Sequence, residues 1–133
     1  MARTLVTESA GWLGAAVVRQ LAARGDQVIA LDNFQAGAPA NLEGMGPNVQ
    51  LIAGDITDLS GLLFVIEKYG LQRIVHTAAI VSVISCPEAP SHVTRVNIDG
   101  TVNVLEANAA LRPRTHPPYL LRGDLRGLPL RAS

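Results

Sequence analysis

The chain has 133 residues, of which 48% are hydrophobic and 17% are charged, with a formal net charge of zero. This is the composition of one globular domain with a hydrophobic core, and it excludes an intrinsically disordered chain. The zero total hides an asymmetry, because residues 1–111 carry a net charge of −4 and residues 112–133 a net charge of +4.

A single cysteine, Cys86, excludes an internal disulfide bond and favours a reducing compartment. The N-terminus lacks the apolar region of a signal peptide, and the longest apolar stretch, near residues 78–86, is too short to span a bilayer. We therefore expect a cytoplasmic protein without a membrane partner. The C-terminal arginines are not interleaved with aromatic residues, so we expect no nucleic-acid partner either.

Residues 4–32 have the pattern strand, glycine turn, helix, strand. A β-branched and apolar run is followed by Gly11 and Gly14, and a second apolar run ends on Asp32, 18 residues after Gly14. An acid about 20 residues after a glycine turn is typical of the βαβ unit that binds a dinucleotide, where it bonds the ribose hydroxyls and disfavours a 2′-phosphate. The pattern therefore predicts NAD binding. The helix of this unit is predicted from the helical spacing of Leu13, Val17 and Leu21, with Val18 and Ala22 beside them.

Position 8 departs from the dinucleotide motif. The spacing of the motif predicts glycines at positions 8, 11 and 14, but the first of these is Glu8. A glutamate places a Cβ in a turn that favours a positive φ, and a negative charge near a diphosphate. We expect the fold to tolerate this residue and the binding of NAD to be weakened.

The alternation of strands and helices continues after a loop rich in glycine and proline at residues 33–48, in which residues 40–43 fit a turn of helix. Residues 49–52 are predicted to form a third strand. A helix that ends at Gly70 follows, with Asp58 or Ser60 as its cap.

Residues 73–78 predict a fourth strand, and Ser91 to Leu111 predict one long helix after an apolar loop. The helix carries Asn97 beside one apolar side, which consists of Val93, Val96, Gly100, Val104 and Ala107. His76 lies in the fourth strand and is interpreted as a packed or hydrogen-bonded residue, because neither His92 nor His116 has metal-ligand spacing with it.

This order predicts an α/β fold, a Rossmann doubly wound parallel sheet that is incomplete at its C-terminal side. Ligands bind at the carboxyl ends of such strands. We therefore expect Gly11, Asp32, Asp55 and Ala78–Ala79 to converge on one edge of the sheet.

Residues 112–133 form a separate, irregular tail rich in arginine and proline, following a Rossmann domain at residues 1–111. The segment Arg112–Pro118 can neither continue a helix nor form a central strand. Tyr119–Leu121 is the only run in the tail that fits an edge strand.

Five pieces of the sequence resemble one known family in their order and spacing. They are Leu5-Val6-Thr7 with Ala10-Gly11-Trp12-Leu13-Gly14, Leu31-Asp32-Asn33-Phe34, Gly54-Asp55-Ile56-Thr57-Asp58, Val75-His76-Thr77-Ala78-Ala79, and the helix from Val96 to Ala107. Together they resemble the extended short-chain dehydrogenase/reductase superfamily, in particular the NAD-dependent epimerase/dehydratase family of nucleotide-sugar enzymes. The resemblance covers residues 3 to about 111.

The resemblance implies a set of cofactor-binding roles. Gly11, Trp12, Leu13 and Gly14 would line the pyrophosphate turn, and Asp32 with Asn33 would hold the adenosine ribose. Asp55 and Ile56 would flank the adenine. Ala78 and Ala79 would pass near the nicotinamide ribose, and Asn97 would support the active site from the helix beneath the cofactor.

The resemblance also implies a catalytic tyrosine followed four residues later by a lysine that lowers its pKa, and this pair is absent. Tyr119 has no such lysine, and the only lysine of the chain is Lys68. We therefore assign no catalytic residue. The change of composition where the family has its fifth strand leads to the hypothesis of a truncated or frameshifted reading frame, which translation of the downstream DNA would test.

Three hypotheses for the function follow. The first is an NAD-dependent, epimerase/dehydratase-like oxidoreductase of nucleotide sugars, and the second is a catalytically inactive, truncated Rossmann remnant with weak or no NAD binding. The third is a protein–protein module that uses the exposed sheet edge. The resemblance further implies pairing of two copies through the helix at residues 91–111.

Overall fold

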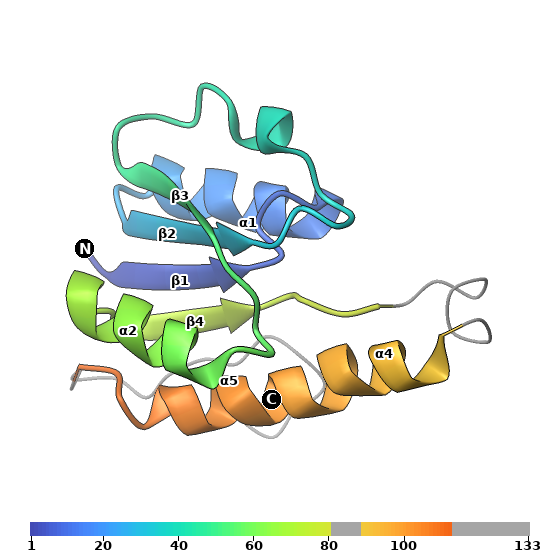
Figure 1. Ribbon diagram of the computed structural model, residues 1–133. Helices are drawn as coiled ribbons and strands as arrows, with labels where there is room; N and C mark the ends of the chain where they lie inside the picture. Colours follow the sequence, from blue (N-terminus) through green and yellow to red (C-terminus); the bar gives the residue numbers. More distant parts are fainter. Residues whose placement is uncertain (81–88, 113–133) are drawn as a thin grey trace, which may run out of the picture.

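The computed structural model describes residues 1–80 and 89–112 and contains one parallel sheet. Its strand order is β3-β2-β1-β4, with β1 at its centre. In the register, Leu5 lies opposite both Ile29 and Ile74 (Figure 1). The strands are β1 (Arg3–Thr7), β2 (Gln27–Asp32), β3 (Val49–Ala53) and β4 (Arg73–His76).

Helices cover both faces of this sheet, as the alternating pattern predicts. The helical elements are α1 (Trp12–Ala23), η1 (Pro39–Leu42), α2 (Leu59–Tyr69), α4 (Pro90–Thr94), η2 (Arg95–Asp99) and α5 (Gly100–Asn108). In Figure 1, α1 and η1 lie on one side of the strands and α2 and α5 on the other. The predicted doubly wound parallel α/β fold is confirmed in the described part of the chain.

Two hydrophobic cores result from the alternation of side chains along the strands. Leu5 of β1 packs in the core under α2 and α5, together with Leu62 and Val104. Its neighbour Val6 faces the opposite way and packs with Val18 in the core under α1. Most residues of β1, β2 and β4 are therefore buried, whereas β3 at the edge of the sheet has none that is fully buried.

The ends of α2 have the caps that the sequence predicts. The Asp58 carboxylate accepts a hydrogen bond from the Gly61 amide at 3.0 Å, which satisfies one of the free donors of the first turn. At the other end, Gly70 has a φ of +57°, the left-handed conformation that glycine adopts most easily. Gly25, with a φ of +86°, similarly follows α1.

Three predicted details are corrected. β4 ends at His76 and not at residue 78, because the Thr77 amide turns to the Thr7 hydroxyl at 3.0 Å instead of continuing the ladder. The long helix is not a uniform α-helix, since residues 95–99 form a π-helical turn. In α1 the buried stripe includes Val18 and Leu21, whereas Leu13 is 58% exposed.

Several predictions lie outside the described residues. They concern Cys86, the middle of the loop before α4, and the tail beyond Arg112 with its candidate strand near Tyr119. In the described ranges, 1–80 and 89–112, no helix combines the length and the apolar character needed to cross a bilayer.

Candidate functional site

The carboxyl ends of β2, β3 and β4 meet around one cavity of about 80 Å³. Asp32, Asp55, Ala78 and Ala79 all line it, as predicted, whereas Gly11, which was predicted to lie at the same edge, is not among its described lining residues. Ile56 contributes an apolar wall. The glycine turn between β1 and α1 was also expected at this edge. It contributes the side chain of Glu8 to the cavity lining.

The turn between β1 and α1 closes tightly on the start of the helix. Glu8 has a φ of +51°, which is the conformation that the motif's missing glycine would adopt without strain. A Cβ at Gly14 would overlap the Glu8 carbonyl oxygen, so only glycine fits there. The backbone therefore forms the turn of a dinucleotide site even though position 8 is occupied by a glutamate.

The side chain of Glu8 crosses from this turn to the segment after β4. Its Oε2 accepts a hydrogen bond from the Ala79 amide at 2.9 Å. Its Cγ and Oε1 lie 3.3 and 3.4 Å from the position that a Cβ on Gly11 would take. The carboxylate thus lies inside the cleft, beside the residue that precedes α1.

Asp32 is 4% exposed at the end of β2, and both of its carboxylate oxygens accept backbone hydrogen bonds. Oδ2 accepts from the Ala10 amide at 2.9 Å, and Oδ1 accepts from the Phe34 amide at 2.7 Å. These two bonds tie the glycine turn to the loop after β2. Each oxygen retains a second lone pair, which is the acceptor that a ribose hydroxyl requires.

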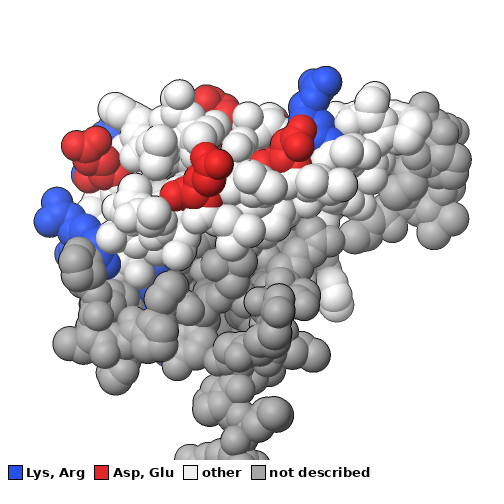
Figure 2. Space-filling model, turned by 90° about the horizontal axis from the view of Figure 1, so that it is seen from below, with Lys and Arg blue, Asp and Glu red and all other residues white. Residues whose placement is uncertain are grey.

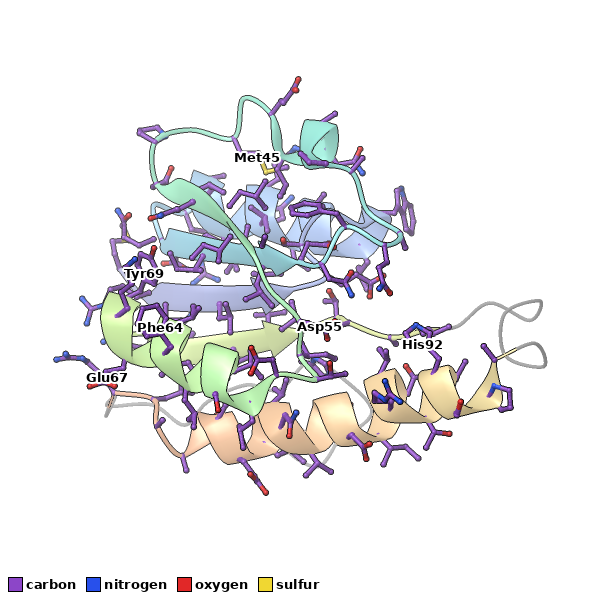
Figure 3. The ribbon with its side chains drawn as sticks, in the orientation of Figure 1. Met45, Asp55, Phe64, Glu67, Tyr69 and His92 are labelled. Carbon is purple, nitrogen blue, oxygen red and sulfur yellow. The ribbon has the colours of Figure 1, made fainter. Side chains whose placement is uncertain are left out.

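Asp55 follows β3 and also lines the cavity. Burial alone would raise its pKa, but hydrogen bonds from the Thr57 amide and hydroxyl and from Asn33, with the charge of His92, hold the pKa below the ordinary value of 3.8. Figure 3 shows Asp55 and His92 at the end of the sheet toward which the strands point. Asp55 is therefore held in its charged form near neutral pH.

Asn97 holds the segment that follows β4. Its Oδ1 accepts from the Ile80 amide and its Nδ2 donates to the Ile80 carbonyl, both at 2.8 Å. The π-helical turn that contains Asn97 also brings Val96 to the cavity lining. Asn97 itself holds the wall of the site through the backbone of Ile80.

Two predicted residues have side chains that lie away from the cavity. Trp12 is 93% exposed and Leu13 is 58% exposed, and neither is among the described lining residues. The sequence reasoning missed Gly37, which lines the cavity and lies so close to Ala10 that an added Cβ would be 2.7 Å from the Ala10 carbonyl carbon. The only sequence signal was its place in a glycine-rich loop.

His76 is fully buried and hydrogen-bonded, as interpreted from the sequence. Its Nδ1 lies 2.9 Å from the Thr7 hydroxyl and its Nε2 lies 3.1 Å from the Thr101 hydroxyl. Across the described residues, no group of three or more His, Cys, Asp and Glu side chains is placed to hold a metal ion. Seen from below, the described surface carries a few acidic and basic groups, some of them next to one another, between wide uncharged areas (Figure 2).

Comparison with known proteins adds a family match to this geometry. The model of the family described as NAD dependent epimerase/dehydratase matches residues 4–116. UDP-glucuronate 4-epimerase 2 of Arabidopsis thaliana is 36% identical over 118 residues, which are 83% of this chain and 27% of that protein. UDP-glucose 4-epimerase of Mycolicibacterium smegmatis is 36% identical over 109 residues, 79% of this chain and 34% of that protein.

Among solved structures, the UDP-glucose 4-epimerase of Thermus thermophilus in complex with NAD is 34% identical, with a TM-score of 0.71. The similarity covers 79% of this chain and 33% of that one. The chain therefore spans about a third of the length of these relatives.

Proposed function

The chain belongs to the NAD dependent epimerase/dehydratase family, and on this premise we propose that residues 1–111 form the adenosine-binding part of a nucleotide-sugar epimerase or dehydratase. One observation carries the proposal. The Asp32 carboxylate stands at the carboxyl end of β2, tied to the glycine turn, and lines the cavity. That is the position from which an acid bonds the ribose hydroxyls of a dinucleotide.

The remaining residues of the cavity suit the same ligand. In this proposal Asp32 and Asn33 hold the ribose, and Asp55 with Ile56 borders the adenine. Ala78 and Ala79 form the wall toward the nicotinamide ribose, and Asn97 is a positioning residue that supports this wall through Ile80. The backbone of Gly11, Trp12, Leu13 and Gly14 forms the turn for the pyrophosphate.

When bound, NAD supplies a nicotinamide that accepts and returns a hydride, and a nucleotide sugar is the substrate class that we propose. The chain's own residues offer no acid–base pair for that reaction within the described part. Lys68 lies 5.3 Å from the centre of the Tyr69 ring. The Tyr69 hydroxyl accepts a hydrogen bond from Gln50, at the opposite end of the sheet from Asp55 (Figure 3).

The two halves of NAD fit this site differently. The adenosine half meets a cavity with an apolar wall and acceptor groups. The diphosphate half meets the Glu8 carboxylate, which is bonded to Ala79 across the same turn. This mismatch supports only the weak NAD binding that belongs to the second candidate, a catalytically inactive remnant with weak or no NAD binding. Turnover of UDP-glucose by the purified chain, in a hydride-transfer assay, would overturn the inactive alternative.

We also propose that two copies pair through η2 and α5. Ile98, Val102 and Leu105 are 58%, 46% and 53% exposed and recur at helical spacing on one side. The resemblance to the family also implies pairing through this helical segment. Sedimentation equilibrium tests the pairing, and a chain that stays monomeric at high concentration would contradict it. The cytoplasm remains the compartment that we expect.

Titration calorimetry with adenosine and with NAD tests the main proposal. We expect the chain to bind adenosine and the variant Asp32→Asn to bind it at least about tenfold more weakly, because a hydrogen bond to a charged group is replaced by one to an amide. Gln50→Ala, at the other end of the sheet, is the control and should not alter binding. If neither adenosine nor NAD binds the chain or its Glu8→Gly variant, the proposal is wrong.

A further inference from the structure

Glu8 is held in its place by the backbone on either side of it. It has a positive φ, and its carbonyl oxygen approaches Gly14 so closely that a Cβ there would overlap it. The Gly11 amide donates a hydrogen bond to that same oxygen at 3.1 Å. The direction of the Glu8 side chain is therefore set by the turn.

The carboxylate of Glu8 lies where an anion is favoured. It is beside Gly11, the residue that caps α1 without any side-chain hydrogen bond, and the first turn of α1 contains no acid. The free amides and the dipole of a helix start favour a negative charge. The Ala79 amide, on the far side of the cleft, donates to Oε2. The protein thus supplies its own anion at this turn.

The charges around the cavity also disfavour a phosphate. Glu8, Asp32 and Asp55 line it, and none of the described lining residues is a lysine or an arginine. Two like charges about 4 Å apart repel each other even in water, and more strongly in a partly enclosed cleft. An entering phosphate must either displace the Glu8 carboxylate from Ala79 or lie against it. A nucleoside without phosphates meets neither cost.

We propose that the Glu8 carboxylate is a built-in substitute for phosphate in this turn, so that the cavity takes an uncharged adenine nucleoside in preference to a nucleotide or dinucleotide. The inference rests on the proposed function, because it uses the same adenosine cavity. It changes the ligand class from a diphosphate-bearing cofactor to a nucleoside.

Calorimetric titration of the whole chain with adenosine, AMP, ADP and NAD tests this inference. We expect adenosine to bind the chain at least as tightly as ADP. In Glu8→Gln, which keeps the length of the side chain and an acceptor for Ala79, the affinity for ADP should rise at least about tenfold, while that for adenosine stays within about twofold. Glu8→Gly should give the same change in preference.

Glu67→Gln is the matched control. It makes the same change of charge on an exposed residue of α2, which Figure 3 shows at the end of the sheet opposite Asp55. It should leave the ratio of ADP to adenosine affinity unchanged. A second measurement needs no variant: because salt screens charge repulsion, raising the salt concentration should increase this ratio in the unsubstituted chain.

The outcomes separate the two proposals. If ADP and NAD bind the unsubstituted chain as tightly as they bind Glu8→Gln, the inference is overturned while the adenosine site stands. If neither the chain nor either Glu8 variant binds adenosine, AMP, ADP or NAD, the proposed function fails and the inference fails with it. Should Glu8→Gly not fold, Glu8→Gln and the salt series still decide the result.

Discussion

At the scale of single residues, Asp32 has a structural task besides the one proposed for binding. Its two oxygens accept the amides of Ala10 and Phe34, which lie on different segments. Phe34 has a φ of +59°, so the loop after β2 makes a sharp turn at this point. The carboxylate satisfies both donors at once, and the site and the fold therefore depend on the same side chain.

Asp32→Asn should therefore destabilise the protein. An amide offers one acceptor oxygen in place of two, so one of the two backbone donors loses its partner, at a cost of about 1–3 kcal/mol. Urea denaturation followed by circular dichroism measures the free energy of unfolding. Asp58→Asn is the matched control, because asparagine caps a helix about as well as aspartate. Equal stability of both variants would contradict this account of Asp32.

The lowered pKa of Asp55 predicts how stability depends on pH. A carboxylate whose pKa is lowered by folding contributes stability that is fully present above its ordinary value of 3.8 and is lost as the pH falls through its folded value. Asp55→Asn should therefore be less stable than the unsubstituted chain near neutral pH, and the difference should shrink below pH 3.8.

Urea denaturation of both proteins across the acid range measures this difference. Thr57→Val is the graded control, since it removes the hydroxyl that donates to Asp55 at 2.8 Å and keeps the amide that donates at 2.9 Å. It should weaken the pH dependence without abolishing it. A difference between the chain and Asp55→Asn that stays constant from pH 7 to acid would count against this role of Asp55.

At the scale of elements, α5 shapes the cavity through its first residue. Gly100 packs so closely on Ile56 that an added Cβ would lie 2.5 Å from the Ile56 Cδ1 atom. Ile56 is 5% exposed and forms part of the cavity wall. The position of the helix and the shape of the site are therefore linked at this contact.

Gly100→Val should lower the free energy of unfolding by about 1–3 kcal/mol, because the new side chain overpacks the contact with Ile56. It should also weaken adenosine binding, since Ile56 must move. Ala109→Val, at an exposed position near the end of the same helix, is the control and should change stability by no more than about 0.5 kcal/mol. Thermal and urea denaturation measure the stability of both variants. A stability of Gly100→Val equal to that of the control would show that the contact is loose.

The elements themselves could be predicted from the sequence because their signals are local. Short apolar runs marked the strands and helical spacing marked the helices, and Asp58 and Gly70 marked the ends of α2. The π-helical turn at residues 95–99 was not predicted, because no local pattern marks it; Asn97 within it bonds to Ile80, a contact that exists only in the folded chain. Leu13 has the right spacing for α1, but it lies at the first turn, beyond the part of the helix that the sheet covers.

At the scale of the whole molecule, all described residues of the two cores lie within residues 1–112. The last described contact of the chain is the hydrogen bond from the Arg112 amide to the Leu71 carbonyl, at 2.9 Å. Val104 and Ala107, just before it, are fully buried. The described residues of both cores therefore belong to the proposed Rossmann domain, residues 1–111.

A chain shortened to residues 1–112 should unfold in one cooperative transition and bind adenosine with unchanged affinity. The reason is that both cores and the cavity lining named here come from this part. Far-ultraviolet circular dichroism in urea and calorimetry measure the two properties. A broad transition without a midpoint would mean that residues 113–133 belong to the folded unit and that the domain boundary is wrong.

The candidate site was predictable as far as the topology determined it. Parallel strands place Asp32, Asp55 and Ala78 on one edge whatever their side chains do. The sequence also indicated that Glu8 conflicts with a diphosphate. It could not show that the side chain points inward and bonds to Ala79, 71 residues away, because that bond exists only once β1 and β4 are paired.

Trp12, the only tryptophan of the sequence, directly follows Gly11, and its side chain is exposed to solvent. Its fluorescence should change little in colour when the protein unfolds, because its surroundings are aqueous in both states. A ligand that settles over the turn would shield it, and the emission would dim or move to shorter wavelength. A fluorimeter can therefore distinguish a molecule that reaches the turn from one that binds only in the cavity at the carboxyl ends of β2 and β3.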